Sequence, residues 1–325
     1  MKVAVEVLKA LREAEGFVSG EHLSSALGIS RAAIWKHIRR LRQEGYEIEA
    51  QRAKGYRLKG SPKGFSPMEI VAALPEGTIW KGIHFFERVG STNDIALQLA
   101  RGGAPEGELV IADEQTKGRG RMGRRWHSPK GVNLYFSFIL RPPLPPSHVP
   151  LITLMASLAL AEAMEGVAEV RPQIKWPNDL LLGGKKVAGI LTEADAQMDL
   201  VKFVIVGVGV NVNMRREEMP GELRSFSTSL LLERGEEVNR LTLLLAFLKD
   251  FDKWYRTFLR GEREEVLRKW EERSAVRGRR VEVVFLDEEI RGVAQGLDRD
   301  GALLVRTGEG EMRRVVAGDL KVKEW

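Results

Sequence analysis

Residues 117–126 combine the residue types that bind anions. They read Lys-Gly-Arg-Gly-Arg-Met-Gly-Arg-Arg-Trp, with three glycines placed among basic side chains. Apolar runs at residues 109–112 and 134–140 predict strands on either side, so the segment between them is predicted to be a loop. Glycine lets a backbone approach a ligand closely, and arginine presents forked donors that suit phosphate or carboxylate. The alternative is a flexible arginine-glycine segment that binds RNA.

A second polar segment precedes a predicted β-hairpin. Residues 175–179 read Lys-Trp-Pro-Asn-Asp and lead into three leucines. The pair Gly183-Gly184 then turns the chain into residues 185–191, Lys-Lys-Val-Ala-Gly-Ile-Leu. Two apolar runs joined by a glycine pair are typical of a hairpin with a tight turn.

The glycine-arginine loop, the Lys-Trp-Pro-Asn-Asp block and the Lys-Val-Ala-Gly-Ile-Leu run together resemble the biotin protein ligases in order and spacing. With the N-terminal segment described below, the chain resembles the bifunctional ligases that also repress the biotin operon, over essentially its whole length. The catalytic residues implied by this resemblance are Arg121, Lys186 and Asp179. The implied biotin contacts are Ser91, Thr92, Asn93, Gln115, Arg119, Gly120, Arg121, Lys186 and Gly189. The implied ATP and adenylate contacts are Arg121, Arg124, Trp126, Lys175, Asn178, Asp179, Asn211 and Phe226, although the family often has tryptophan at the last position.

The implied reaction needs no nucleophile from the enzyme. In the family, the biotin carboxylate attacks the α-phosphate of ATP, pyrophosphate leaves, and biotinyl-5′-AMP forms. A lysine of the biotin carboxyl carrier domain of a carboxylase then attacks this anhydride and releases AMP. Such chemistry requires positioned positive charge, which the arginines of the loop and Lys186 can supply. It also implies Mg2+ with ATP, held by Asp179 directly, through water or together with substrate oxygens.

Simpler interpretations stay open for several of these residues. A lysine in a hairpin, such as Lys186, ordinarily faces solvent. Trp126 and Trp176 can be packing residues, Arg125 a solvated side chain, and Gly189 a site of close packing. Three other functions also stay open: a lipoate ligase, which shares the catalytic fold, a ligand-sensing repressor without turnover, and an RNA-binding protein. The histidines have no metal-ligand spacing, so we predict no bound transition metal.

The first 61 residues have the pattern of a DNA-binding domain. Apolar residues at helical spacing predict three helices, with Ser19 and Ser30 as N-caps of the second and third. Apolar alternation over residues 46–58 predicts a two-stranded wing, so the segment resembles a winged helix-turn-helix. The predicted DNA contacts are Ser30, Arg31, Trp35, Lys36, Arg39 and Lys54. The alternative is that these charges form an ordinary solvated helix face.

The distribution of charge agrees with a DNA-binding segment. Residues 1–61 hold 12 lysines and arginines against 7 acidic residues, whereas the rest of the chain holds 39 against 38. A basic excess confined to one segment favours a nucleic-acid module joined to a near-neutral body. The sequence has no cysteine, which excludes disulfides and cysteine metal sites. We see no signal peptide and no apolar run of about 20 residues, and expect a cytoplasmic protein without a membrane partner.

We therefore predict an α+β protein with three domains. These are a winged helix-turn-helix at residues 1–61, a mixed-sheet ligase domain like the class II synthetases at 62–274, and a small SH3-like β-barrel at 275–325. Residues 60–64 are a linker by composition, and residues 214–224 are a predicted mobile loop. By resemblance, the partners are biotin, ATP, the carrier domain, operator DNA and a second copy of the chain in a homodimer promoted by biotinyl-5′-AMP.

Overall fold

A computed structural model describes residues 2–62, 65–285 and 288–323 of the chain. The chain divides into two compact units, Met1–Gly77 and Thr78–Trp325. Two residues of the predicted linker, Lys63 and Gly64, lie outside the described residues. Each unit is described by itself below.

The first unit contains the predicted helices and wing. Its elements are α1 (Lys2–Glu13), α2 (Gly20–Leu27), α3 (Arg31–Gln43), β1 (Glu47–Gln51), β2 (Gly55–Gly60) and α4 (Pro67–Ala73). The Ser19 hydroxyl accepts from the His22 N–H at 3.0 Å, and the Ser30 hydroxyl accepts from the Ala33 N–H at 3.2 Å. Both predicted N-caps are therefore confirmed. Strands β1 and β2 pair antiparallel and form the predicted wing.

Helix α4 belongs to this unit, which is longer than the predicted 1–61 segment. Met68 is 1% exposed and lies in the same core as the apolar residues of α1 and α3. The Tyr46 hydroxyl lies 3.1 Å from the Ser66 hydroxyl, and Arg12 forms an ion pair with the nearly buried Glu69. Helix α4 follows the predicted linker, residues 60–64, and supplies core side chains, so its removal would expose that core.

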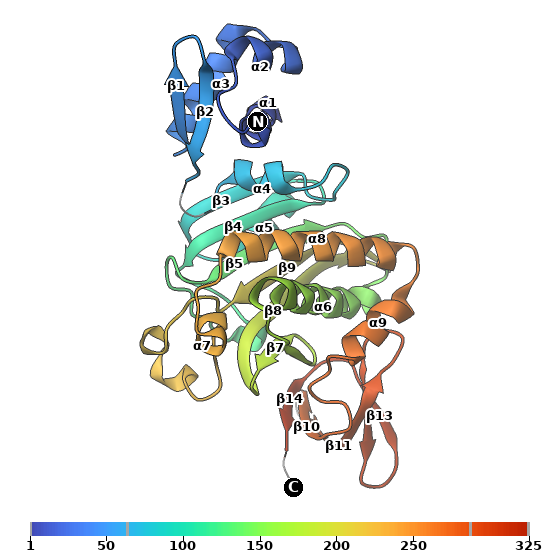
Figure 1. Cartoon of the computed structure of the whole chain (residues 1–325). Coiled ribbons are helices and arrows are strands. Elements are labelled where there is room, and N and C mark those ends of the chain that lie inside the picture. Colours follow the sequence, from blue (N-terminus) through green and yellow to red (C-terminus); the bar gives the residue numbers. More distant parts are fainter. Residues whose placement is uncertain (1, 63–64, 286–287, 324–325) are drawn as a thin grey trace. The chain divides into compact units, whose positions relative to one another are not determined.

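The second unit is built on a seven-stranded mixed sheet (Figure 1). Its strands are β3 (Gly82–Val89), β4 (Glu108–Gln115), β5 (Leu134–Leu140), β6 (Gln173–Lys175), β7 (Asp179–Leu182), β8 (Lys185–Gln197) and β9 (Leu200–Val210). The spatial order is β3-β4-β5-β9-β8-β7-β6, with β3 and β4 parallel and each other neighbouring pair antiparallel. The predicted hairpin is β7–β8, and its Gly183 and Gly184 both have positive φ.

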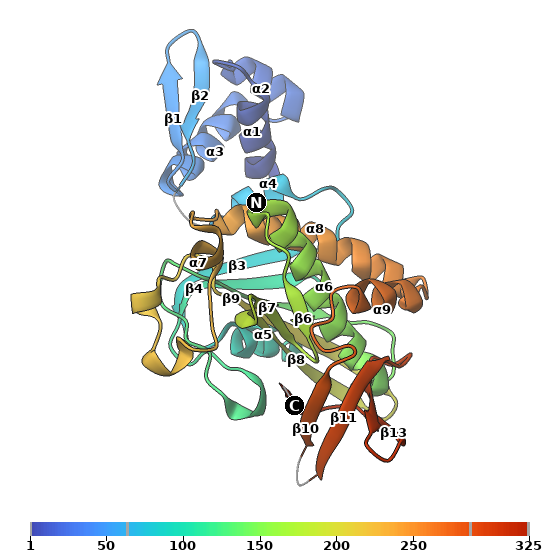
Figure 2. The same ribbon diagram turned by 60° about the horizontal axis from the view of Figure 1, so that its bottom comes forward.

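Helices cover both faces of this sheet. On one face lies α5 (Thr92–Arg101), whose alanines pack against Val110 and Ile139. On the other lie α6 (Val149–Ala168) and α8 (Arg240–Leu259), which run side by side (Figure 2). Phe138 of β5 meets Phe251 of α8 edge-on, with ring centroids 4.7 Å apart. The shorter helix α9 (Arg263–Glu271) packs against α6 and α8, and the first residues of the short helix α7 (Leu230–Arg234) hydrogen-bond to the chain just after the end of β9.

A second, smaller sheet completes the second unit. Strands β10 (Arg280–Phe285), β11 (Glu288–Leu297), β12 (Leu303–Thr307), β13 (Met312–Val315) and β14 (Asp319–Val322) form an antiparallel sheet in the order β13-β12-β11-β10-β14. This sheet is the small β domain expected at the C-terminus.

Among the described residues, one helical stretch, Pro146–Ala168, is long and apolar enough to cross a membrane, and 72% of it is buried inside the protein.

The position of Met68 leads to a stability prediction for residues 1–77. Met68→Ala should lower the free energy of unfolding of this fragment by about 2–5 kcal/mol, because truncating a buried methionine removes apolar contact and leaves a cavity. Urea unfolding followed by circular dichroism measures the change. Glu76→Ala alters an exposed residue of the same segment and should stay within about 0.5 kcal/mol of the parent. Equal effects of the two substitutions would contradict the assignment of α4 to this core.

Candidate functional site

The second unit contains a cavity of about 770 Å³ beside the glycine-arginine loop. This volume is within the range of small-molecule sites, about 300–1,000 Å³. All of the ligand contacts implied by the sequence line it: Ser91, Thr92, Asn93, Gln115, Arg119, Gly120, Arg121, Arg124, Trp126, Lys175, Asn178, Asp179, Lys186, Gly189, Asn211 and Phe226. The structure thus brings together four segments that are far apart in the chain.

Three glycines form the floor of the cavity, and we call Gly189, Gly207 and Gly209 the glycine patch. Gly189 of β8 is paired directly with Gly209 of β9. A Cβ at Gly209 would lie 2.5 Å from the Trp126 ring, and one at Gly207 would lie 1.9 Å from Asn93 Oδ1. Both distances are shorter than van der Waals contact, so Trp126 and Asn93 lie directly on the sheet backbone. The glycine at each position is required by this close approach.

The Ser-Thr-Asn segment forms the start of α5, and its side chains line the cavity. Ser91 occupies the N-cap position but makes no side-chain capping bond. The Thr92 N–H and hydroxyl both donate to Gln115 Oε1, at 2.9 and 3.1 Å. The Ser137 hydroxyl lies 2.6 Å from Asn93 Oδ1, to which it donates. Ser137 was not predicted, although a serine inside the apolar run 134–140 was a visible signal.

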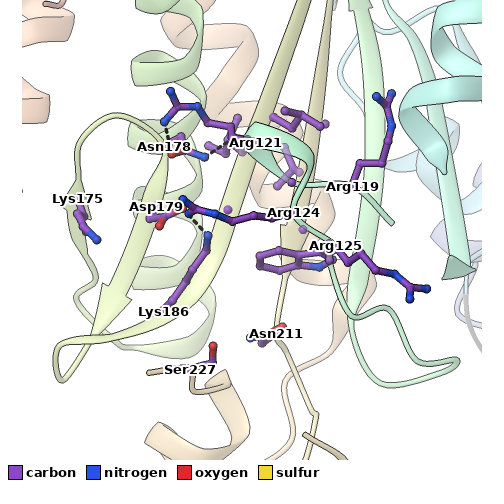
Figure 3. Close-up of a pocket in the computed structure, with 18 of the residues that line it drawn as sticks. Arg119, Arg121, Arg124, Arg125, Lys175, Asn178, Asp179, Lys186, Asn211 and Ser227 are labelled. Carbon is purple, nitrogen blue, oxygen red and sulfur yellow. Dashed lines mark hydrogen bonds and ion pairs between the residues drawn. The ribbon is translucent and has the colours of Figure 1, made fainter. Parts of the chain in front are cut away.

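Charged groups gather at one part of the cavity wall (Figure 3). Lys186 Nζ lies 2.6 Å from Asp179 Oδ1, and it also lies 5.3 Å from the centroid of the Trp126 ring. Asp179 Oδ1 is buried. Apart from this ion pair, it accepts no hydrogen bond of normal geometry from the described residues. Arg121 Nη1 donates to Asn178 Oδ1 at 3.3 Å.

Strand β14 of the C-terminal sheet also reaches this side of the cavity. The Gly318 carbonyl accepts from Arg121 Nη1 at 3.3 Å, and Asp319 forms an ion pair with Arg124. Residues 319–322 line the cavity. These contacts could not be predicted, because nothing in the pattern of residues 312–323 differs from an ordinary small β domain.

Burial changes the titration of these charged groups. It lowers the pKa of the Arg121 guanidinium and of the Lys175 ammonium, while the charge of Asp179 partly offsets both changes. Burial alone would raise the pKa of Asp319, but the hydrogen bond from Arg124 and the neighbouring cations lower it overall. Partly desolvated cations attract an anion more strongly than exposed ones, since less water screens them.

Two arginines of the loop point away from this charged group. In Figure 3 the side chains of Arg119 and Arg125 extend away from Lys186 and Asp179. The Arg119 guanidinium binds both carboxylate oxygens of Glu193, at 3.0 and 2.9 Å. Glu193 was not among the predicted site residues.

The remaining wall of the cavity follows β9. Asn211 Nδ2 donates to the Thr228 carbonyl at 2.9 Å, which holds residues 226–228 beside the start of β8. Phe226 is 52% exposed at the rim. The segment 214–224, predicted as a mobile loop, contains two short 3-10 turns, Arg216–Glu218 and Gly221–Leu223.

The first unit presents a basic surface on α3. Arg31, Lys36 and Arg39 are exposed, and Trp35 is 52% exposed with the Arg39 guanidinium 5.7 Å from its ring. Lys54 lies in the turn of the wing. These are groups that contact phosphates and base edges in helix-turn-helix proteins.

Comparison with family models assigns each part of the chain. Residues 85–211 match the biotin/lipoate A/B protein ligase family, residues 6–57 match a helix-turn-helix domain, and residues 277–320 match the biotin protein ligase C-terminal domain. The chain is 41% identical over 306 residues to the bifunctional ligase/repressor BirA of Bacillus subtilis, covering 94% of both chains. It is 32% identical over 321 residues to BirA of Escherichia coli, covering 99% of this chain and 97% of the relative.

A solved structure is similar to about three quarters of the chain. The biotin protein ligase from Aquifex aeolicus in complex with biotin and ATP superposes with a TM-score of 0.66 at 32% identity. The superposition covers 76% of this chain and all of that one.

The glycine patch leads to a second stability prediction. Gly207→Ala should destabilise the protein by about 1–3 kcal/mol, because the new methyl group would overlap Asn93 and force the side chain from its place. Thermal unfolding measures the change. Gly166→Ala is the control, since nothing lies within 4 Å of a Cβ there, and alanine in a helix should be neutral or stabilising. Unchanged stability of Gly207→Ala would show that Asn93 does not rest on this glycine.

Proposed function

Since the chain belongs to the biotin protein ligase family, we propose that it transfers biotin through biotinyl-5′-AMP to a lysine of a biotin carboxyl carrier protein. The protein is an ATP-dependent biotin ligase that also carries the helix-turn-helix of the bifunctional ligase/repressors. One observation carries the assignment of the site: Lys186, Asp179 and Arg121 converge on a cavity floored by the glycine patch. We further propose that it acts in the cytoplasm, where its carrier and operator DNA are found.

The two sides of the cavity suit the two substrates. The side formed by the glycine patch, Trp126 and the Ser-Thr-Asn turn is apolar with a few fixed polar groups, as a bicyclic ring with a urea group requires. The charged side suits the biotin carboxylate and the α-phosphate. Lys186 and Arg121 neutralise the charge that these two anions bring together, so that the carboxylate oxygen can attack phosphorus.

The second step needs retention of the adenylate rather than a new catalytic group. The carrier lysine attacks the carbonyl carbon of the anhydride, and AMP leaves with the bonding electrons. Arg121 and Arg124 would hold the phosphate of the adenylate until the carrier arrives. Asn211 and Phe226 would contact the nucleotide at the far wall.

Magnesium would be held by few protein groups. The carboxylates that face the cavity are Asp179 and Asp319, and among the described residues no cluster of three histidine, cysteine or acidic side chains exists. This donor set fits a magnesium ion that keeps its water and arrives with nucleotide oxygens. When bound, the ion would withdraw charge from the phosphates, with Asp179 as its protein ligand directly or through water.

The function is tested by adenylate formation and transfer. With biotin and ATP, the parent protein should form biotinyl-5′-AMP, detected by mass spectrometry, and should add one biotin to a carrier domain. Lys186→Gln should slow adenylate formation about 10²–10³-fold, the usual cost of removing one donor from a charge-stabilising site.

Lys185→Gln is the matched control, because neighbouring residues of a strand face opposite sides and Lys185 does not line the cavity. It should keep the parent rate. Lipoate in place of biotin tests the other substrate of the wider family. A parent protein that forms no biotin adenylate, or prefers lipoate, would refute the proposed function.

We also propose that the adenylate promotes homodimerisation and operator binding. One helix-turn-helix reads one half-site, and an operator of two half-sites requires a two-fold dimer. Ordering of the cavity loops by the adenylate would lower the entropic cost of dimerisation, which makes the adenylate a corepressor. Linkage then requires dimerisation to tighten adenylate binding by the same factor.

Analytical ultracentrifugation tests this coupling. The dimer should form at about 5–150-fold lower protein concentration when biotin and ATP are present together, the usual range of a coupling free energy. Biotin with an ATP analogue whose α,β-bridge cannot be cleaved is the control, because it fills the cavity without forming the adenylate. An equilibrium that does not respond to ligand would refute the corepressor role and leave the ligase assignment intact.

A further inference from the structure

Glu193 touches two parts of the cavity wall without lining the cavity itself. Its Oε2 accepts from Asn93 Nδ2 at 2.7 Å. Its two carboxylate oxygens also accept from the Arg119 guanidinium at 3.0 and 2.9 Å. Asn93 belongs to the Ser-Thr-Asn turn and Arg119 to the glycine-arginine loop. A single carboxylate therefore joins the two segments.

The orientation of Asn93 is fixed from its other side. The Ser137 hydroxyl donates to Asn93 Oδ1 at 2.6 Å, and the missing side chain of Gly207 leaves room for that oxygen. The amide NH2 group of Asn93 must then face Glu193. A guanidinium also has only donors, so both neighbours of Glu193 require an acceptor.

Backbone hydrogen bonds connect Arg119 to the rest of the loop. The Gly120 N–H donates to the Arg124 carbonyl at 2.7 Å, and Arg119 and Arg125 form an antiparallel bridge. The Trp126 N–H donates to the Gly118 carbonyl at 2.9 Å, which closes the base of the loop. The loop is thus a small hairpin, and fixing Arg119 restrains the tip that carries Arg121.

We infer that Glu193 is a positioning residue that ties the glycine-arginine loop to the biotin-side turn and so sets how long the site retains its adenylate. This inference rests on the proposed function. The carboxylate is specific to the role. Its Oε2 accepts from both Asn93 and Arg119, and its Oε1 accepts from Arg119 Nη1, where glutamine would place an NH2 donor against another donor. The pair is partly exposed, with 32% and 38% of the side chains of Glu193 and Arg119 accessible, so it contributes little to folding.

The test is Glu193→Gln in the full chain. The adenylate formed with labelled biotin should dissociate about tenfold faster than from the parent, since one charge-assisted pair is lost. The melting temperature should stay unchanged. Arg119→Met should show the same acceleration, and the double variant should release the adenylate no faster than either single variant.

Asp94→Asn is the matched control. Asp94 Oδ1 also lies 2.8 Å from the Arg119 guanidinium, but Asp94 takes no part in the Glu193–Asn93 contact. It should change adenylate release by less than about twofold, as expected for an exposed pair. Release that is equally fast from Asp94→Asn and Glu193→Gln would show that charge on Arg119 matters and the link to Asn93 does not.

Proteolysis without ligand tests the role of Glu193 independently of the proposed function. Trypsin should cut the loop 117–126 faster in Glu193→Gln than in the parent or in Asp94→Asn, because the tether is lost. Equal cleavage of Glu193→Gln and the parent, or equal adenylate release, would overturn the inference. A parent that forms no adenylate would overturn the proposed function, and the cleavage rates would still decide whether Glu193 tethers the loop.

Discussion

The site depends on how closely two side chains approach the backbone of β8 and β9. Gly207 and Gly209 are two residues apart, so they face the same side of the sheet, and Gly189 is paired beside Gly209. Asn93 and Trp126 occupy the space that side chains at these positions would fill. The same side of the sheet carries α5, whose first turn supplies the Ser-Thr-Asn segment. Because the three strand positions of the glycine patch have no side chains, the sheet leaves room there for the floor of the cavity and for the loop that covers it.

Local patterns predicted the elements well because their causes are local. A serine cap bonds to a backbone N–H three residues away, as at Ser30, and the Gly183-Gly184 turn joins adjacent strands. Motifs matched to a family placed every predicted ligand contact on one cavity. Glu193 and Asp319 were missed because their arginine partners are 74 and 195 residues away in the chain. A lone acidic residue on a strand gives no indication of such a distant partner.

The first compact unit extends past the predicted segment 1–61 for a related reason. The segment after residue 60 has the glycine and proline content of a linker, and composition describes only the local chain. Met68 and Glu69 then return to the core and to Arg12, through contacts over more than fifty residues. A short helix with one apolar face must pack against another part of the protein. The local sequence pattern does not predict which neighbouring domain that is.

The two sides of the cavity are held by different kinds of interaction. On the side proposed to bind biotin, Thr92 and Asn93 are 3% exposed, and hydrogen bonds to Gln115 and Ser137 help to fix them. Breaking one such bond leaves a buried polar group unpaired, which costs about 1–3 kcal/mol, so this side keeps its shape. On the side proposed to bind the phosphates, the Arg124–Asp319 pair has side chains 57% and 39% exposed. An exposed pair is worth about 0–1 kcal/mol, so an entering phosphate can replace the carboxylate at little cost. In the proposed site, a rigid biotin side and exchangeable phosphate contacts would let the enzyme select one acid and then release pyrophosphate and AMP in turn.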